Sequence, residues 1–97
     1  MKVELLYWEG CPSYPEAQAL LEEVLGPKGE IEVRHVASQQ EAEALRFPGS
    51  PTIRIDGRDV DAAGADGPPS LSCRIYHLPD GRVSPVPSRE ALEAALR

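Results

Sequence analysis

The fold is decided near the start of the chain by the stretch Trp8-Glu9-Gly10-Cys11-Pro12-Ser13-Tyr14-Pro15-Glu16. The residues before it are mostly apolar and predict a strand over about residues 2–8. The residues after it carry apolar side chains at the spacing of one helix face: Ala17, Leu20, Leu21, Val24 and Leu25. Cys11 is therefore expected at a strand-to-helix corner, where unpaired backbone N–H groups and the positive end of the helix dipole favour thiolate over thiol. A nucleophilic or redox-active cysteine needs this setting, and we expect the Cys11 sulfur to be partly open to solvent there.

The first helix can begin in two ways. Cys11 could be its N-cap, with Pro12 at the first helical position, where a missing N–H has no cost. Alternatively, Ser13 is the N-cap, because Ser13 and Glu16 have the spacing of a capping box. We favour the second start, which leaves Cys11 in the turn just before the helix.

Length and charge restrict the class of protein. The chain has 97 residues, enough for one domain with a small core. Its 16 Asp and Glu residues against 10 Lys and Arg give a net charge of −6, which argues against nucleic acid or an anionic membrane surface as a partner. No apolar run reaches membrane-spanning length and the N-terminus lacks a signal peptide's apolar core, so we expect a cytoplasmic protein. Two cysteines in a cytosolic chain favour metal binding, redox chemistry or packing over a structural disulfide framework.

The first half of the chain predicts a βαβ unit and a second, short helix. Gly26-Pro27 ends the first helix, and residues 31–36 predict a strand parallel to the first, joined by a right-handed crossover. Ser38-Gln39-Gln40-Glu41 is a capping box, which opens a helix that runs to about Arg46.

A hairpin and a loop are predicted to follow. Residues 52–55 read as a third strand, and Asp56-Gly57 is a strong two-residue hairpin signal that returns residues 58–60 antiparallel. Residues 61–71 are rich in Ala, Gly, Asp and Pro without periodicity, so we expect a loop. Residues 72–78 predict another strand.

The end of the chain predicts a turn and a helix. Pro79-Asp80-Gly81 is a turn signal, and Pro85 and Pro87 exclude a central strand after it. Ser88 is the expected cap of a final helix with an apolar stripe made of Ala91, Leu92, Ala95 and Leu96.

This order of elements, with Cys11 after the first strand and Pro51 immediately before the third, resembles the thioredoxin fold. Two motifs carry the resemblance, Gly10-Cys11-Pro12-Ser13-Tyr14 and Gly49-Ser50-Pro51-Thr52. The resemblance implies an α/β protein: a three-layer α/β/α sandwich with a mixed sheet of about four strands and three helices. Residues 1–97 would form one such domain, with an insertion around 62–82. Together with Ser72-Cys73-Arg74, the motifs are more narrowly similar to small bacterial thioredoxin-like proteins.

The resemblance also assigns roles to individual residues. Cys11 would be the nucleophilic cysteine, and Pro51 a cis-proline facing it. Ser50 would offer backbone hydrogen bonds to a bound peptide or thiol. From their positions beside Cys11, we also place Pro12 and Tyr14 in the substrate-binding set. Trp8 and Tyr14 flank the cysteine and could shield the thiol or supply a binding surface, and packing is an equal alternative for Trp8.

The sequence departs from the family's Cys-x-x-Cys motif, because Tyr14 stands at the fourth position. A mixed disulfide on Cys11 must then be resolved by an external thiol such as glutathione, as in a monothiol glutaredoxin. Alternatively, Cys73 resolves it, if the loop of residues 61–71 brings the two Cα atoms within about 7 Å. The competing interpretation, which we favour for Cys73, is a small buried hydrophobic residue on a strand.

No metal site and no cofactor is predicted. His35 and His77 lack metal-ligand spacing to a cysteine and are expected to be structural, although capture of a soft metal by Cys11 and Cys73 stays open. The leading hypothesis is a thiol–disulfide oxidoreductase or redox-responsive protein with protein or low-molecular-weight thiols and disulfides as partners. The alternative is a non-catalytic thioredoxin-fold binding module or a thiolate metal-binding protein.

Overall fold

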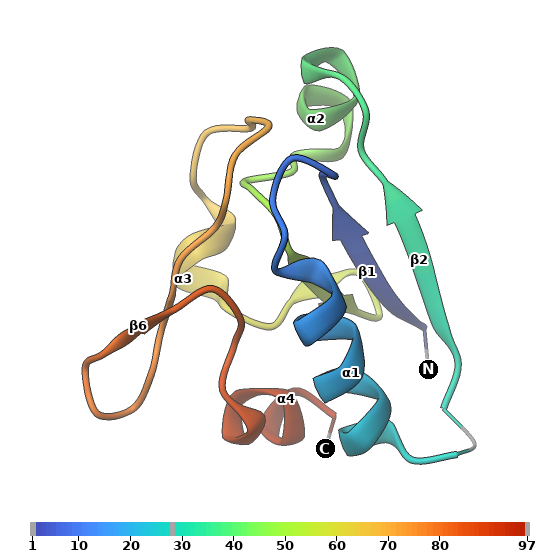
Figure 1. Cartoon of the computed structure of the whole chain (residues 1–97), viewed down its shortest axis with the longest axis vertical. Coiled ribbons are helices and arrows are strands. Elements are labelled where there is room, and N and C mark those ends of the chain that lie inside the picture. The colour runs from blue at the N-terminus through green and yellow to red at the C-terminus, as the bar shows by residue number, and fades with distance from the viewer. Residues whose placement is uncertain (1, 28, 97) are drawn as a thin grey trace.

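A mixed α/β arrangement is present in the computed structural model, which describes residues 2–27 and 29–96 (Figure 1). Within those residues the main sheet has four strands, in the order β2-β1-β3-β4. Their bounds are β1 Val3–Tyr7, β2 Ile31–His35, β3 Thr52–Ile55 and β4 Arg58–Asp59. β1 pairs parallel with β2 and antiparallel with β3, and β3 pairs antiparallel with β4. The parallel βαβ unit and the hairpin expected from the sequence are thus confirmed.

Helices pack on both faces of this sheet because the side chains of β1 alternate between them. Val3 and Leu5 face helix α1 (Tyr14–Leu25) and helix α4 (Arg89–Ala95), which pack against each other. Leu6 points the other way, into a second cluster beneath helix α2 (Gln39–Leu45). The larger cluster joins these buried residues: Val3, Leu5, Ala17, Leu21, Ile53, Ile55, Val86 and Leu92.

Two of the three serine helix caps predicted from the sequence are confirmed. The Ser38 hydroxyl accepts the N–H of Glu41, and the Ser88 hydroxyl accepts the N–H of Ala91, both at 3.1 Å. Ser13 does precede α1, but the predicted capping box is wrong, because its side chain makes no cap bond. Ser13 has helical angles (φ −88°, ψ −5°) instead of the extended ones seen at the other two caps, which places its hydroxyl elsewhere.

The turn between β3 and β4 has the geometry that its residues predict. Asp56 and Gly57 both have positive φ, 53° and 82°. Two consecutive positive φ values characterise the type I′ turn, whose twist matches the hairpin.

Residues 61–78 differ from the prediction. The expected loop contains a single helical turn, α3 (Ala62–Ala65), and the expected strand over 72–78 is wrong except at β5 (Tyr76–His77). β5 pairs antiparallel with β6 (Val83–Ser84) in a small separate sheet, and β6 stops before Pro85. Residues 72–74 leave this ribbon because their backbone is bonded to Ser50 instead.

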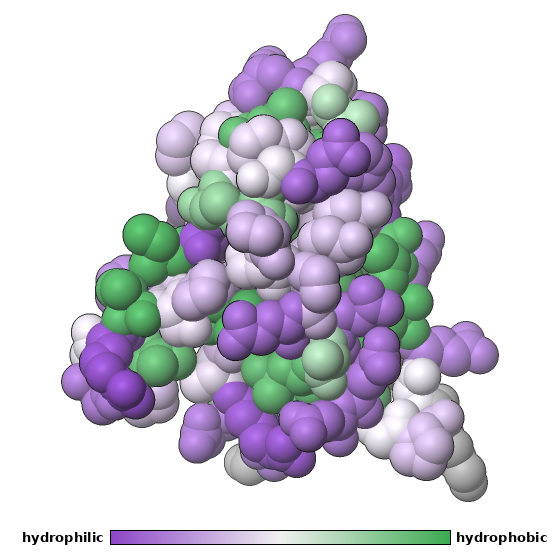
Figure 2. All heavy atoms as spheres, viewed as in Figure 1, coloured by the Kyte–Doolittle hydropathy of each residue, from purple (hydrophilic) through white to green (hydrophobic). Residues whose placement is uncertain are grey.

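The molecular surface is mixed in polarity. In the view of Figure 2, green apolar residues gather on the side that carries β6 in Figure 1. Ile75 and Val83 are the most exposed large apolar side chains among the described residues, at 59% and 63%. No helix in the described part of the chain combines the length and apolar character needed to cross a membrane.

Candidate functional site

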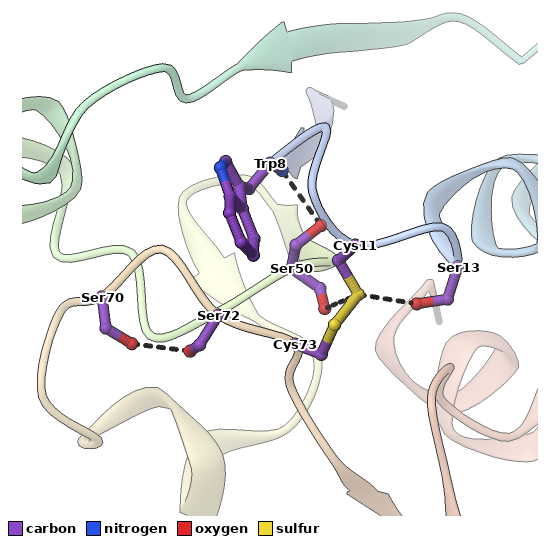
Figure 3. Close-up of a disulfide and its surroundings, with 7 residues drawn as sticks. All are labelled: Trp8, Cys11, Ser13, Ser50, Ser70, Ser72 and Cys73. Carbon is purple, nitrogen blue, oxygen red and sulfur yellow. Dashed lines mark hydrogen bonds between the residues drawn. A yellow bond between two sulfur atoms is a disulfide. The ribbon is translucent and has the colours of Figure 1, made fainter.

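Cys11 and Cys73 form a disulfide across the sheet end where β1 meets α1 (Figure 3). The two residues are 62 positions apart in the sequence and their Cα atoms are 5.5 Å apart. That separation lies well within the range of disulfides. The favoured interpretation of Cys73 as a buried strand residue is therefore wrong, since Cys73 is exposed and bonded to Cys11.

Cys11 lies in the turn before α1, as expected, and its N–H donates to the Trp8 carbonyl at 3.1 Å. Its sulfur, however, is not open to solvent, because the residue is only 1% exposed. The Cys11 Sγ atom lies 3.2 Å from Ser13 Oγ and 3.6 Å from the Ser50 carbonyl oxygen. The expectation of an accessible Cys11 is wrong because Ser50 and the segment carrying Cys73 cover it.

Ser50 connects the two cysteines. Its hydroxyl accepts the Trp8 N–H at 3.0 Å, which fixes it beside the Cys11 turn. Its backbone N–H donates to the Ser72 carbonyl at 2.7 Å, and its carbonyl accepts the Arg74 N–H at 2.8 Å. Cys73 lies between these two bonds, paired with Ser50 as in a parallel bridge. Ser50 thus binds an extended backbone, and the bound segment belongs to the chain itself.

We call residues 70–74 the Cys73 arm. Besides its bonds to Ser50, the arm is held at its start, where the Ser70 N–H donates to the Phe47 carbonyl at 3.0 Å. The Ser70 and Ser72 hydroxyls are 2.6 Å apart (Figure 3). The arm therefore has fixed contacts on both sides of the cysteine.

The other predicted site residues divide into two groups. The Ser50–Pro51 bond is cis, as expected, and the buried Pro51 accepts the Tyr76 hydroxyl at its carbonyl, 2.6 Å away. Pro12 is exposed beside Cys11. Tyr14 is directed elsewhere, since its ring stacks on Tyr7 with 4.0 Å between centroids.

We expected the two histidines to be structural residues. Both are exposed, so they are not part of the buried core. His35 stacks against Tyr7 at 5.1 Å between centroids. His77 lies on β5. Across the described residues, no group of three or more His, Cys, Asp and Glu side chains could hold a metal ion.

Arg74 is a site residue that sequence reasoning missed. Its guanidinium forms a bidentate ion pair with Asp59, at 2.7 Å and 2.8 Å, and also donates to the carbonyl of Asp61 at 3.0 Å. It lies 4.5 Å from the Tyr76 ring centroid. The only sequence signal was its position next to Cys73, and nothing in the spacing connects it with the hairpin strand that carries Asp59.

The surroundings of Arg74 keep its guanidinium charged, and those of Tyr76 keep its phenol neutral. Burial by itself lowers the pKa of Arg74, but the hydrogen bonds to Asp59 and the charges around it raise the pKa above its usual value. Burial raises the pKa of the Tyr76 phenol, although the positive charge of Arg74 acts in the opposite direction. Tyr76 therefore remains a hydrogen-bond donor to Pro51 at neutral pH.

One surface hollow lies away from the disulfide. It has a volume of about 620 Å³ and is lined by residues around the end of α1, including Glu22, Gly26 and Ile31. Cys11 precedes the other end of this helix, which spans 12 residues or about 18 Å. The cysteines therefore do not serve a deep binding pocket at that location.

Comparison of the chain with family models, with curated proteins and with solved structures gave no match.

Proposed function

We propose that the chain is a thioredoxin-like thiol–disulfide oxidoreductase whose redox pair is Cys11 and Cys73. The sheet order β2-β1-β3-β4, with helices on both faces, supports the three-layer α/β/α arrangement that the sequence resemblance implies. The position of Cys11 between β1 and α1 and the cis bond at Ser50–Pro51 support the same assignment.

The observation that carries the proposal is the Cys11–Cys73 disulfide itself. The chain lacks the second cysteine of a Cys-x-x-Cys motif, so it needs another thiol to release a mixed disulfide within the molecule. Cys73, held within 5.5 Å Cα–Cα of Cys11, supplies that thiol. In the exchange the Cys11 thiolate attacks a partner disulfide, a mixed disulfide forms on Cys11, and one partner thiol leaves. Cys73 then attacks the Cys11 sulfur, the Cys11–Cys73 bond forms, and the second partner thiol leaves.

Two features of the surroundings of Cys11 favour the thiolate that this attack requires, and they oppose the effect of its burial. The sulfur lies at the N-terminal end of α1, where the helix dipole stabilises negative charge. The Ser13 hydroxyl lies 3.2 Å from the sulfur. Because it makes no helix-cap bond, it can donate a hydrogen bond to the sulfur. A hydrogen bond to a charged acceptor contributes roughly 1.5–3 kcal/mol.

The proposal is tested by equilibrating the whole protein in glutathione redox buffers, trapping free thiols with an alkylating agent and weighing the products. We expect one reversible two-electron transition at a potential above about −300 mV, the limit below which structural disulfides typically lie. Retention of the disulfide through the whole glutathione range would refute an exchange function.

A second candidate is a non-catalytic module in which the disulfide is a structural staple. The observation in its favour is the burial of Cys11 to 1% exposure beneath an arm anchored by buried Arg74. A potential below about −300 mV in the same experiment favours this candidate.

The soft-metal alternative is that the reduced cysteine pair binds a metal through its two thiolates. Titration with cadmium, followed by thiolate absorbance, tests it.

The expected partners are protein or low-molecular-weight thiols and disulfides, and no cofactor takes part in the proposed exchange. The cytoplasmic location stays a prediction from the sequence. In that compartment disulfides are usually transient and catalytic or redox-sensing, which agrees with the exchange function and not with the staple.

A further inference from the structure

The two sulfur-bearing residues of the disulfide differ in their access to solvent. Cys11 is 1% exposed, whereas Cys73 is an exposed residue on the arm above it. In Figure 3 the Cys11 sulfur lies between Ser13 and Ser50, and Cys73 reaches it from the arm. An incoming thiol can therefore reach Cys73 more easily than Cys11.

We infer that external thiols and disulfides exchange with Cys73, and that Cys11 is the internal partner that never carries the external group. This inference rests on the proposed redox function, and it reverses the roles that the sequence resemblance implies. Thiol–disulfide exchange requires a thiolate to reach the sulfur that it attacks, so access decides which sulfur reacts.

The reduction can be written with all atoms and electrons accounted for. A low-molecular-weight or protein thiolate attacks Cys73 Sγ, a bond forms between the two sulfurs, and the Cys11–Cys73 bond breaks with its electron pair leaving on Cys11. A second thiol attacks the external sulfur of the mixed disulfide and releases Cys73 as a thiolate. The two protons of the external thiols end on Cys11 and Cys73, so two thiols are oxidised to one disulfide while the protein disulfide is reduced.

The geometry around Cys11 also supports its role as the leaving thiolate. Cys11 departs at the N-terminal end of α1, next to the Ser13 hydroxyl at 3.2 Å. A leaving sulfur that is stabilised as thiolate leaves faster. Access and leaving-group chemistry therefore favour the same direction of attack.

The arm is expected to stay in place after reduction. Its backbone bonds to Ser50 on both sides of Cys73, at 2.7 Å and 2.8 Å, do not involve the sulfurs. The Arg74–Asp59 pair, whose side chains are 4% and 6% exposed, fixes the residue next to Cys73. Arg74 is thus a positioning residue, which keeps Cys11 covered and Cys73 outermost in both redox states.

The test compares Cys11→Ser with Cys73→Ser, each reduced and then mixed with oxidised glutathione. Serine is nearly isosteric with cysteine, so the arm contacts are retained. We expect Cys73 in the first variant to form its glutathione adduct at least about tenfold faster than Cys11 in the second, because only the thiolate that glutathione can reach reacts. An equal or faster adduct on Cys11 overturns the inference.

A measurement on the wild-type protein keeps the test valid if either variant fails to fold. The fully reduced protein is treated with less than one equivalent of N-ethylmaleimide, and the label is located by peptide mapping. Label on Cys73 supports the inference, and label mainly on Cys11 overturns it. Glutathione equilibration of the same wild-type sample separates the two proposals: exchange with the label on Cys11 refutes the role assignment alone, whereas absence of exchange refutes the redox function as well.

Discussion

Arg74 and Asp59 form a bidentate ion pair that is almost completely removed from solvent, with their side chains 4% and 6% exposed. The pair joins the Cys73 arm to strand β4 of the main sheet. Cys73 carries the covalent link to Cys11, and the neighbouring Arg74 carries the ionic link to Asp59. The position of Cys73 therefore depends on a charge that must stay paired.

Replacing Asp59 with Asn should destabilise the protein strongly, because it leaves the Arg74 charge buried without its counter-ion. Breaking a buried pair in this way costs about 3–5 kcal/mol of unfolding free energy. Urea denaturation of the oxidised protein measures this cost. The matched control is Glu23→Gln, which removes an exposed pair with Arg89 (67% and 52% exposed) and should cost no more than about 1 kcal/mol. Equal losses in the two variants would contradict the anchoring role of Arg74.

The raised pKa of Tyr76 should make the free energy of unfolding decline at alkaline pH. Because the folded pKa lies above the unfolded value of about 10, the contribution of the neutral phenol to stability is complete below that pH and declines as the pH rises beyond it. Tyr76→Phe should lose about 1–3 kcal/mol at neutral pH, since the Pro51 carbonyl loses its donor, and should lack this part of the alkaline decline. Urea unfolding at several pH values from 8 to 11 measures both effects. Tyr14→Phe is the control, and a Tyr76→Phe profile parallel to that of the control would rule out this origin of the decline.

The sequence was sufficient to predict the strands of the main sheet and the helices α1, α2 and α4, because those elements carry local signals. Three local signals each specify a short segment without reference to the rest of the chain: the apolar run of β1, the helix face that includes Ala17 and Leu21, and the Asp56-Gly57 turn. The cis bond before β3 was expected only through the resemblance to the thioredoxin fold.

The arm was not predictable for a physical reason. Residues 72–78 have the β-forming composition of a strand, but backbone bonds to Ser50 and the burial of Arg74 decide their path, and both involve residues distant in sequence. The same long-range contacts reverse the exposure of the two cysteines. Local position predicted an open Cys11 and a buried Cys73, whereas the packing of the arm on Ser50 covers Cys11 and leaves Cys73 outermost.

Gly49 should be sensitive to any side chain, because the arm passes directly over it. Its φ is 138°, and an added Cβ would lie 3.1 Å from Arg74 Cβ and 3.3 Å from Arg74 Cα. Gly49→Ala should therefore displace the arm and shift the glutathione equilibrium of Cys11 and Cys73 toward the dithiol. The control is Gly57→Ala, which also has positive φ, 82°, but no atom within 4 Å of the added Cβ. It should cost about 1 kcal/mol of stability without changing the redox equilibrium. An unchanged equilibrium in Gly49→Ala would show that the arm tolerates the displacement.

Ser13 and Ser88 stand at equivalent places before their helices, yet they should respond differently to removal of the hydroxyl. Ser88 caps α4, so Ser88→Ala should cost about 1 kcal/mol of unfolding free energy and leave thiol exchange unchanged. Ser13 makes no cap bond and lies 3.2 Å from Cys11 Sγ, so Ser13→Ala should cost little stability. It should instead slow reduction of the disulfide by glutathione about tenfold, the equivalent of about 1.5 kcal/mol, because the departing Cys11 thiolate loses a hydrogen bond to a charged acceptor. Rates from alkylation-quenched time courses and urea denaturation of both variants give the comparison. If Ser13→Ala lowered stability as Ser88→Ala does and left the reduction rate untouched, the hydroxyl would belong to the helix and not to the sulfur.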